Sequence, residues 1–280
     1  MNAFGHRYYP SVVSWLYLDY RIIACVLMIF VASKKSRLSI DRTNWQFGEQ
    51  PINVLTLTVY SHGVGLPILF EFLDKKGNSN YQERIDLLTE FVALFGKDRI
   101  LSLWADREFV GHKWVKWLTD NSIGFAIGFP STHLITLPNG AVHSAKELLD
   151  NHLEGYFHNL ILDGIPLNLA LQRLEADLLM VAGSCLPKKL FQQYRYRWSI
   201  EIFFQSLKKR GFRLEETHLK DLVRLKKLLT IVALAFVFCW QVGLHHHHYT
   251  KTIALKNHGY KANSFFRKGL ELIPNACKFL

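Results

Sequence analysis

The order of the apolar runs along the chain is the feature that most constrains its fold. Runs rich in β-branched and aromatic residues come first, and helical spacing follows them. The strand-like runs cover residues 37–41, 52–61, 64–73 and 99–106, and the helical runs cover 81–95 and 111–121. Turn-prone residues between the first three runs predict sequential antiparallel strands. Strands, then a helix, then another strand predict a mixed α/β sheet covered by helices.

The pattern changes in the middle of the chain. Residues 129–184 form short alternating segments, and the turn signals "PNG" and "DG" separate them. We expect a β-rich insertion here, with helices resuming near residue 186. A chain of 280 residues that is 49% hydrophobic can bury a substantial core, either as one large domain or as a domain with an insertion.

The charge of the chain favours polyanionic partners. Thirty-four basic residues against 23 acidic ones give a formal charge of +11, which suits nucleic acid or an anionic membrane surface. The four cysteines lie far apart, without the paired spacing of a zinc site, and they are too few for a disulfide scaffold. A reducing, cytoplasmic setting is the simpler interpretation.

Two apolar runs raise the question of a membrane. Residues 22–32 and 228–240 are both shorter than the roughly 20 apolar residues that span a bilayer. We expect both to be buried helices, the second in the core, and we expect neither a membrane span nor a signal peptide. The run His245 to His248 could bind a transition metal, but we interpret it as a polar spacer after the second helix.

The stretch "YRYRWSIEIFFQSLKKRGF" at 194–212 carries one acidic residue among five basic ones. At 100° per residue, one narrow helical stripe would carry Tyr194, Arg197, Glu201 and Lys208. Apolar side chains flank this stripe on both sides. One interpretation is a surface ion pair between Arg197 and Glu201, which contributes about 0.2 to 0.5 kcal/mol. The other is a functional site.

Two aspartates upstream favour the functional interpretation. Asp41 ends the run "RLSID" and Asp106 ends "ILSLWAD", and ligands gather at the carboxyl ends of strands in α/β sheets. Each aspartate could instead pair with the arginine that follows it, Arg42 or Arg107. Together with Glu201, however, they would form a cluster of oxygen ligands for Mg²⁺ or Mn²⁺. Two such ions can promote phosphoryl transfer.

These residues resemble a known family. The spacing of Tyr194, Arg197, Glu201 and Lys208 matches without a gap the Tyr-Arg-Glu-Lys signature of the insertion-sequence type four transposases, which are DDE-type enzymes. Further blocks resemble the same family in the same order: "SIDRTNWQFG", "FLDKKGNSN", "ADREFVG" and "HGYKANSFFRKGLELI". The resemblance extends from about residue 39 to residue 273.

The resemblance implies an RNase H-like core whose triad is interrupted by a β-stranded insertion. By position, Asp41, Asp106 and Glu201 are expected to be the catalytic metal ligands, for two ions of Mg²⁺ or Mn²⁺. Arg197 and Lys208 are expected to hold phosphates of the transposon end, with Tyr194 beside the DNA backbone. The implied reaction is strand cleavage at the element's ends and transfer to target DNA. In relatives, excision can pass through a hairpin with a base flipped onto an aromatic residue, and we expect Trp198 to lie in the core rather than to fill that role.

The expected organisation has four parts. Residues 1–36 are a short helical N-terminal remnant, 37–128 and 185–244 the RNase H-like catalytic core, 129–184 the β-rich insertion, and 245–280 a C-terminal tail. By resemblance, the partners are transposon ends and target DNA, bound by a homodimer in the bacterial cytoplasm, at the nucleoid when bound.

The short N-terminus leaves several hypotheses open. Relatives carry a substantial N-terminal DNA-binding region, whereas only 40 residues precede Asp41, so we interpret the chain as the product of a truncated element. It is an active or cryptic transposase, or else a catalytically silent DNA-binding remnant that pairs with a full-length enzyme. A protein anchored in a membrane through residues 228–240 is the third hypothesis.

Overall fold

A computed structural model describes residues 18–31, 33–47, 50–175, 177–208, 211–257 and 261–276. The chain divides into two compact units. The larger unit contains residues 33–65 and 69–204, and the smaller contains residues 1–32, 66–68 and 205–280. Each unit is described by itself below.

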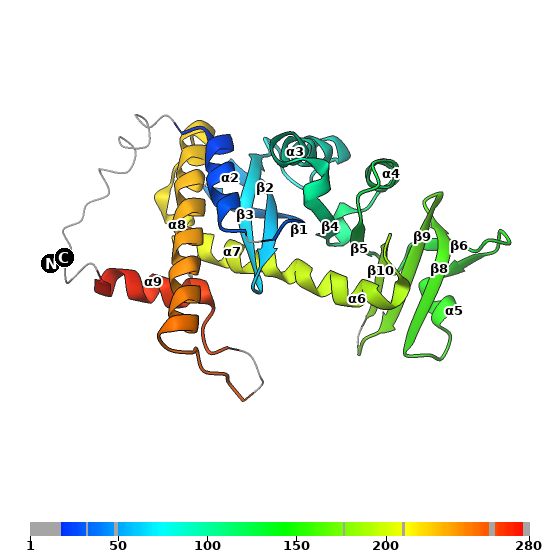
Figure 1. Cartoon of the computed structure of the whole chain (residues 1–280). Coiled ribbons are helices and arrows are strands. Elements are labelled where there is room, and N and C mark those ends of the chain that lie inside the picture. Colours follow the sequence, from blue (N-terminus) through cyan, green and yellow to red (C-terminus); the bar gives the residue numbers. More distant parts are fainter. Residues whose placement is uncertain are drawn as a thin grey trace. The chain divides into compact units, whose positions relative to one another are not determined.

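The larger unit is built on one mixed sheet (Figure 1). The strand order is β3-β2-β1-β4-β5-β10-β9-β8-β6-β7. The strands are β1 (Ser36–Phe47), β2 (Gln50–Ser61), β3 (Val64–Phe72), β4 (Ile100–Ala105), β5 (Phe125–Phe129), β6 (Leu134–Thr136), β7 (Val142–Ser144), β8 (Glu154–Leu162), β9 (Ile165–Arg173) and β10 (Leu178–Gly183). The expected fold class, an RNase H-like mixed sheet with flanking helices, is confirmed.

The centre of the sheet combines a long hairpin with parallel strands. β1 pairs antiparallel with β2 along its whole length, from Leu38 opposite Val59 to Phe47 opposite Gln50. β4 pairs parallel with β1 and with β5. Leu38, Ile40, Leu55 and Leu57 are fully buried, and so are the intervening residues Ser39 and Thr56. Because successive side chains point to opposite faces, both faces of this hairpin are covered. The predicted strands and their order are therefore confirmed in this part of the chain.

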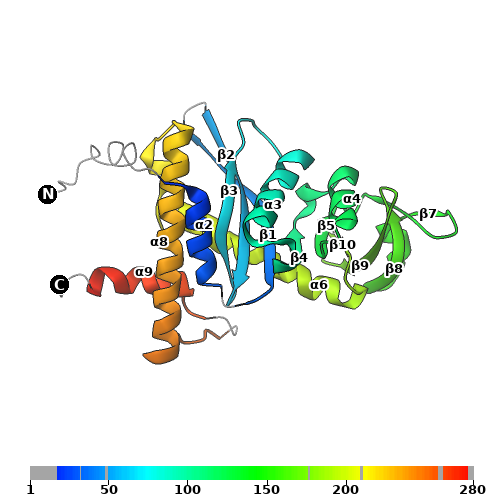
Figure 2. The same ribbon diagram turned by 45° about the horizontal axis from the view of Figure 1, so that its top comes forward.

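Helices cover this sheet. The larger unit contains α3 (Tyr81–Phe95), α4 (His112–Asp120), α5 (Ala145–Leu149), α6 (Pro187–Arg195) and most of α7 (Ser199–Leu207), with short 3-10 turns at Lys97–Arg99, Arg107–Phe109 and Tyr196–Trp198. α3 and α6 lie on opposite sides of the strands β1 and β4 (Figures 1 and 2). α3 begins where Asn80 and Glu83 form a reciprocal capping box, which satisfies two backbone N–H groups.

The region predicted to be β-rich contains β6 to β10 and the short helix α5. β10 pairs antiparallel with β5 and with β9, so these strands continue the same sheet. The division of the chain into the four expected domains stays a prediction. Half of its first part, residues 1–17 and 32, lies outside the described residues.

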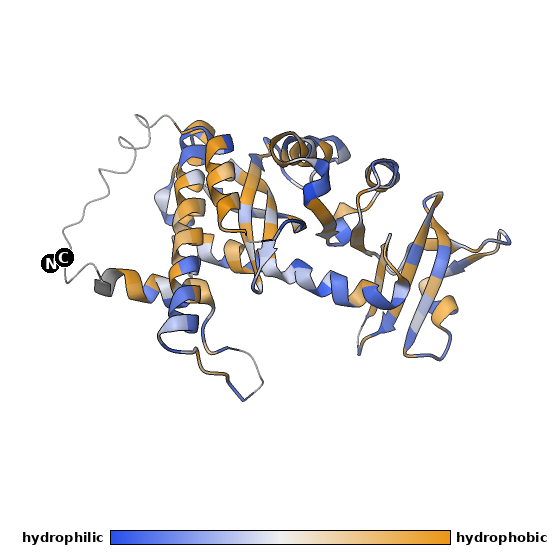
Figure 3. Ribbon diagram, in the orientation of Figure 1, coloured by the Kyte–Doolittle hydropathy of each residue, from blue (hydrophilic) through white to orange (hydrophobic). Residues whose placement is uncertain are grey.

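Among its described residues, the smaller unit contains the end of α7, the helices α2 (Tyr20–Ile29), α8 (Leu222–Tyr249) and α9 (Phe265–Ala276), and the 3-10 turn Leu214–Thr217. Figure 3 shows apolar residues along the middle of α8 and polar residues near its C-terminal end. α2 was predicted to be a buried helix. The helix is present and buries Ala24, Leu27 and Met28. Ile22 and Ile29 are 62% and 78% exposed, so the prediction of burial is confirmed for one face only.

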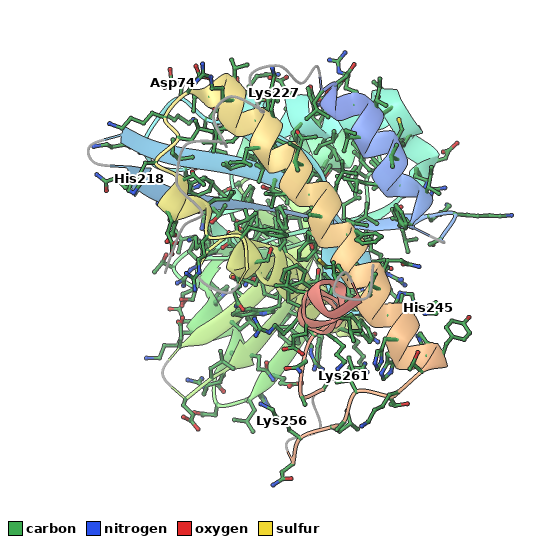
Figure 4. The ribbon with its side chains drawn as sticks, turned by 90° about the vertical axis from the view of Figure 1, so that its left-hand side faces the viewer. Asp74, His218, Lys227, His245, Lys256 and Lys261 are labelled. Carbon is green, nitrogen blue, oxygen red and sulfur yellow. The ribbon has the colours of Figure 1, made fainter. Side chains whose placement is uncertain are left out.

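The histidine run also differs from the prediction. His245 to His248 are part of α8, not a spacer after it. Figure 4 labels His245 near the C-terminal end of α8, and Lys256 and Lys261 on the segment beyond it. The Nδ1 atom of His247 accepts a hydrogen bond from the backbone N–H of Ile253 at 2.8 Å. This histidine therefore ties the chain that leaves α8 back to the helix.

α8 is the one described helix whose length and composition would allow it to cross a membrane. Half of its most apolar stretch is buried inside the protein, and Leu225, Leu229, Phe236 and Trp240 are among the core residues. Core helices of globular proteins have the same composition.

Candidate active site

Asp41 lies where β1 stops pairing with β4. The parallel pairs between these strands end at Ser39 opposite Trp104, whereas the hairpin with β2 continues to Phe47. The strand therefore extends six residues past Asp41, and the expectation that it ends at this residue is wrong. The backbone N–H of Arg42 donates to Oδ1 of Asp41 at 2.7 Å.

Asp106 directly follows β4, as the sequence predicted. It is the N-cap of the 3-10 turn Arg107–Phe109, and its Oδ1 accepts a hydrogen bond from the backbone N–H of Glu108 at 2.9 Å. A short polar side chain that caps a turn in this way has a fixed direction. Because β1 and β4 are parallel neighbours, Asp41 and Asp106 come to the same edge of the sheet.

Arg197 brings the third carboxylate to the other two. Its Nη1 atom lies 3.5 Å from Oδ2 of Asp41, 4.0 Å from Oδ2 of Asp106 and 3.8 Å from Oε1 of Glu201. Glu201 is in the first turn of α7, where the helix dipole favours a negative charge. These distances exceed the roughly 2.7 to 2.9 Å of a strong charge-assisted hydrogen bond. Three carboxylates thus surround one positive nitrogen without close contact.

Burial and mutual repulsion change the chemistry of Asp41. Burial, followed by the negative charge of Asp106, raises the pKa of Asp41 from 3.8 to about 7. The backbone N–H of Arg42 and the charge of Arg197 act in the opposite direction. Burial and the neighbouring carboxylates therefore outweigh the effect of Arg197 on the pKa of Asp41. A nearby cation would lower that pKa again.

Tyr194 packs beside Arg197, as the spacing predicted. The guanidinium of Arg197 lies 5.7 Å from the centre of the Tyr194 ring. Burial raises the pKa of the Tyr194 hydroxyl, although the positive charge of Arg197 lowers it. A Cβ atom added at Gly128 in β5 would lie 2.6 Å from that hydroxyl oxygen, so the strand accommodates the tyrosine because residue 128 has no side chain.

Two expectations for the signature segment need correction. The segment is not one uniform helix: α6 ends at Arg195, a 3-10 turn contains Arg197, and Lys208 lies in the turn after α7. Lys208 belongs to the smaller unit, and its predicted place beside the other three residues stays a prediction. Trp198 was expected in the core, but it is 62% exposed, with the Arg197 guanidinium 4.6 Å from its ring centre.

The sequence interpretation missed the residues around the two aspartates. Arg42 pairs with Glu108 rather than with Asp41, and Arg107 lies 3.8 Å from Asp177 rather than pairing with Asp106. Arg84 of α3 is buried with its charge. Glu108 is the acidic residue that directly follows Arg107 in "DREF". Nothing in the sequence, however, indicates which acidic residue an arginine reaches across the fold.

The donor set fits a divalent metal ion of the Mg²⁺ or Mn²⁺ class. All three side chains offer carboxylate oxygens, which these ions prefer. As they stand, no three His, Cys, Asp or Glu side chains among the described residues are grouped closely enough to share one ion. The guanidinium of Arg197 lies between the three carboxylates instead.

The sequence matches one protein family. Residues 32–238 match the family model described as the transposase DDE domain, a range that includes Asp41, Asp106 and Glu201. No curated protein matches the chain.

Similar solved structures are distant in sequence. A piggyBac transposase synaptic complex with hairpin DNA has a TM-score of 0.48 and 12% identity, and the match covers 86% of this chain and 52% of that one. Endonuclease V of Ciona intestinalis in complex with inosine-containing DNA has a TM-score of 0.39 and 9% identity, and the match covers 72% of this chain and 98% of that one. The chain thus spans about half the length of the piggyBac structure.

Proposed function

Because the chain belongs to the transposase DDE domain family, we propose that it is a DNA transposase that cleaves DNA at the ends of a mobile element and transfers the freed strand to target DNA. The convergence of Asp41, Asp106 and Glu201 on the Arg197 guanidinium carries this proposal. The proposal includes membership of the insertion-sequence type four group, for which the Tyr-Arg-Glu-Lys spacing is the support.

In the proposed reaction, the three carboxylates hold two divalent metal ions. Bound there, the ions would activate an attacking oxygen and stabilise the leaving one. Asp41 and Asp106 are each fixed by a backbone N–H group, so they need little reorganisation to act as ligands. Glu201 lacks such a bond among the described contacts, and 36% of its side chain is exposed. It is therefore the more adjustable ligand.

We propose that Arg197 exchanges the carboxylates for a DNA phosphate when a metal ion binds. In the metal-free protein its guanidinium balances the carboxylates, and its planar donor set also suits a DNA phosphate. A divalent cation among the carboxylates would repel the guanidinium, which would then be available for the scissile strand. Tyr194 packs along Arg197 and limits the directions in which it can move. Lys208 is proposed to bind the same strand farther along.

The proposed partners are transposon ends and target DNA, and the formal charge of +11 supports binding to a polyanion. The piggyBac structure is a synaptic complex with DNA, and a homodimer that holds two DNA ends is part of the proposal. The place of action would then be the nucleoid in the bacterial cytoplasm.

A silent DNA-binding remnant is the second candidate function. The observation that favours it is the position of Arg197: a guanidinium permanently held among the carboxylates would exclude the metal ions. Such a protein would bind DNA with a strong dependence on salt and would not cut it.

Cleavage of a labelled duplex that carries the element's own ends distinguishes the two functions. The wild type is expected to nick this duplex with Mn²⁺ or Mg²⁺, and Glu201→Gln is expected to lose at least about 100-fold in rate while still binding DNA. Glu216→Gln, which changes an exposed glutamate, is the matched control and should cut like the wild type. Tight binding with no nicking by any of the three proteins would favour the silent remnant.

A further inference from the structure

An ion pair links the two aspartates on the side away from Arg197. Arg42 follows Asp41 in β1, so its side chain points to the opposite face of the strand. There its guanidinium binds both carboxylate oxygens of Glu108, with Nε to Oε1 at 3.1 Å and Nη2 to Oε2 at 3.2 Å. This two-pronged contact fixes direction as well as distance.

Each member of this ion pair also holds one aspartate through its backbone. The N–H of Arg42 donates to Asp41 at 2.7 Å, and the N–H of Glu108 donates to Asp106 at 2.9 Å. The connection therefore runs from Asp41 through Arg42 and Glu108 to Asp106 without a gap. A change in the ion pair shifts the two backbone N–H groups that orient the aspartates.

Neighbouring residues hold the ion pair in place. Nη1 of Arg42 donates to Oδ1 of Asn53, and Nη2 also donates to Oδ1 of Asn78, both at 3.1 Å. The amide of Asn53 in turn donates to the carbonyl oxygens of Lys75 and Gly77. The Arg42 side chain thus has a partner for each of its donor atoms in this part of the structure, and it is largely sheltered from water.

Arg84 supports the other end of the connection from α3. It is only 4% exposed, and its guanidinium donates to the carbonyl oxygens of Glu108 at 3.0 Å and Val110 at 3.3 Å. The same group donates to the hydroxyl and the carbonyl of Ser79. Burial lowers the pKa of Arg84 to about 10, so it remains charged at neutral pH. The loop that follows Asp106 is thereby fixed to the helix.

We propose that the Arg42–Glu108 ion pair is a positioning device that sets the separation of Asp41 and Asp106 for divalent metal ions. This inference rests on the proposed function, because it assumes that the aspartates are metal ligands. Neither Arg42 nor Glu108 touches the metal or DNA in this role. Partners that orient metal ligands typically change metal affinity by about 10- to 100-fold when they are removed.

A direct contact with a DNA phosphate is the competing role for Arg42. The residue lines a cavity of about 330 Å³ together with Lys75 and Lys76, which is suitably basic. The two roles differ in what Glu108 does. A positioning role requires both residues equally, whereas a phosphate-binding arginine would bind DNA better once the competing carboxylate of Glu108 is removed.

Calorimetric titration of the metal-free full chain with Mn²⁺ tests the proposal. Arg42→Gln and Glu108→Gln are each expected to weaken Mn²⁺ binding by about 10-fold or more. The double variant should be no weaker than the worse single variant, because both changes break one interaction. Arg42→Lys keeps the charge but loses the two-pronged geometry, so we expect a smaller loss. Arg107→Gln, with an exposed side chain on the same turn, should bind Mn²⁺ like the wild type.

Two further measurements complete the design. Thermal unfolding identifies any variant that fails to fold, and Arg42→Lys then replaces Arg42→Gln. DNA binding in EDTA should be the same for the wild type, Arg42→Gln and Glu108→Gln. Mn²⁺ affinity that is unchanged in both single variants overturns the inference, and so does a DNA-binding loss confined to Arg42→Gln. A wild type that binds no Mn²⁺ contradicts the proposed function instead.

Discussion

At the scale of single residues, the site holds more negative than positive charge. Asp41 is buried beside Asp106, and Glu201 adds a third negative group. Arg197 supplies one positive charge at distances of 3.5 to 4.0 Å. At neutral pH the folded protein therefore keeps a partly ionised carboxylate in an unfavourable environment, which supports the proposal of a metal site here.

Asp41→Asn is expected to stabilise the metal-free protein at pH 8 by roughly 1 to 3 kcal/mol. The folded-state pKa of Asp41 is about 7 and its ordinary pKa is 3.8. The contribution of Asp41 to the free energy of unfolding is therefore fully present below pH 3.8, and it is lost as the pH rises through 7. The gain from the substitution should thus be larger at pH 8 than at pH 5, measured by urea denaturation in EDTA.

Asp120→Asn, which changes an exposed aspartate, is the control for this measurement and should shift the free energy of unfolding by less than about 0.5 kcal/mol. If Asp41→Asn is less stable than the wild type at pH 8, then the carboxylate is stabilised by Arg197 more than it is repelled by its neighbours.

The three carboxylates that lie around Arg197 could be singled out from the sequence because each follows a recognisable local pattern. The patterns are the strand-like runs before Asp41 and Asp106, and the spacing around Glu201. The partners of the charged residues were less predictable. Arg42 reaches Glu108, which is 66 residues away in the chain. Trp198 was placed by helical angles, but a 3-10 turn changes those angles.

At the scale of elements, periodicity identified the strands and helices of the sheet region well. α3 was predicted at 81–95 and is found at those residues, because Asn80 caps its start and Gly96 follows its end. Strand ends were less predictable. β1 continues beyond Asp41 because β2 supplies a hydrogen-bonding partner up to Phe47, and the sequence does not show how long that pairing lasts.

The crossing of α8 and α9 depends on two glycines. A Cβ atom at Gly243 would collide with the carbonyl oxygen of Phe265, and one at Gly269 would collide with the carbonyl oxygen of Cys239. We expect Gly243→Ala to destabilise the protein by about 1 to 3 kcal/mol, although alanine is the better helix former. Thermal or urea unfolding measures this effect.

Phe238→Ala is the control on the same helix, since Phe238 is 57% exposed, and it should have a much smaller effect. A Gly243→Ala protein as stable as the wild type, or more stable, would show that the two helices do not need this close approach.

At the scale of the whole molecule, the family match extends from residue 32 to residue 238 and so includes parts of both compact units. The sequence resemblance and the family match agree that the chain contains a transposase DDE domain. The formal charge of +11 supports the proposed binding to DNA.

The proposed function requires that the carboxylates ligate the metal ions used in DNA cleavage. Asp106→Cys tests this requirement, because a thiolate is a poor ligand for Mg²⁺ and a better one for softer ions such as Mn²⁺. On a duplex with the element's ends, we predict that Asp106→Cys is inactive with Mg²⁺ and regains part of its cleavage with Mn²⁺. Equal activity, or equal inactivity, with the two ions while the wild type cuts with both would contradict the account.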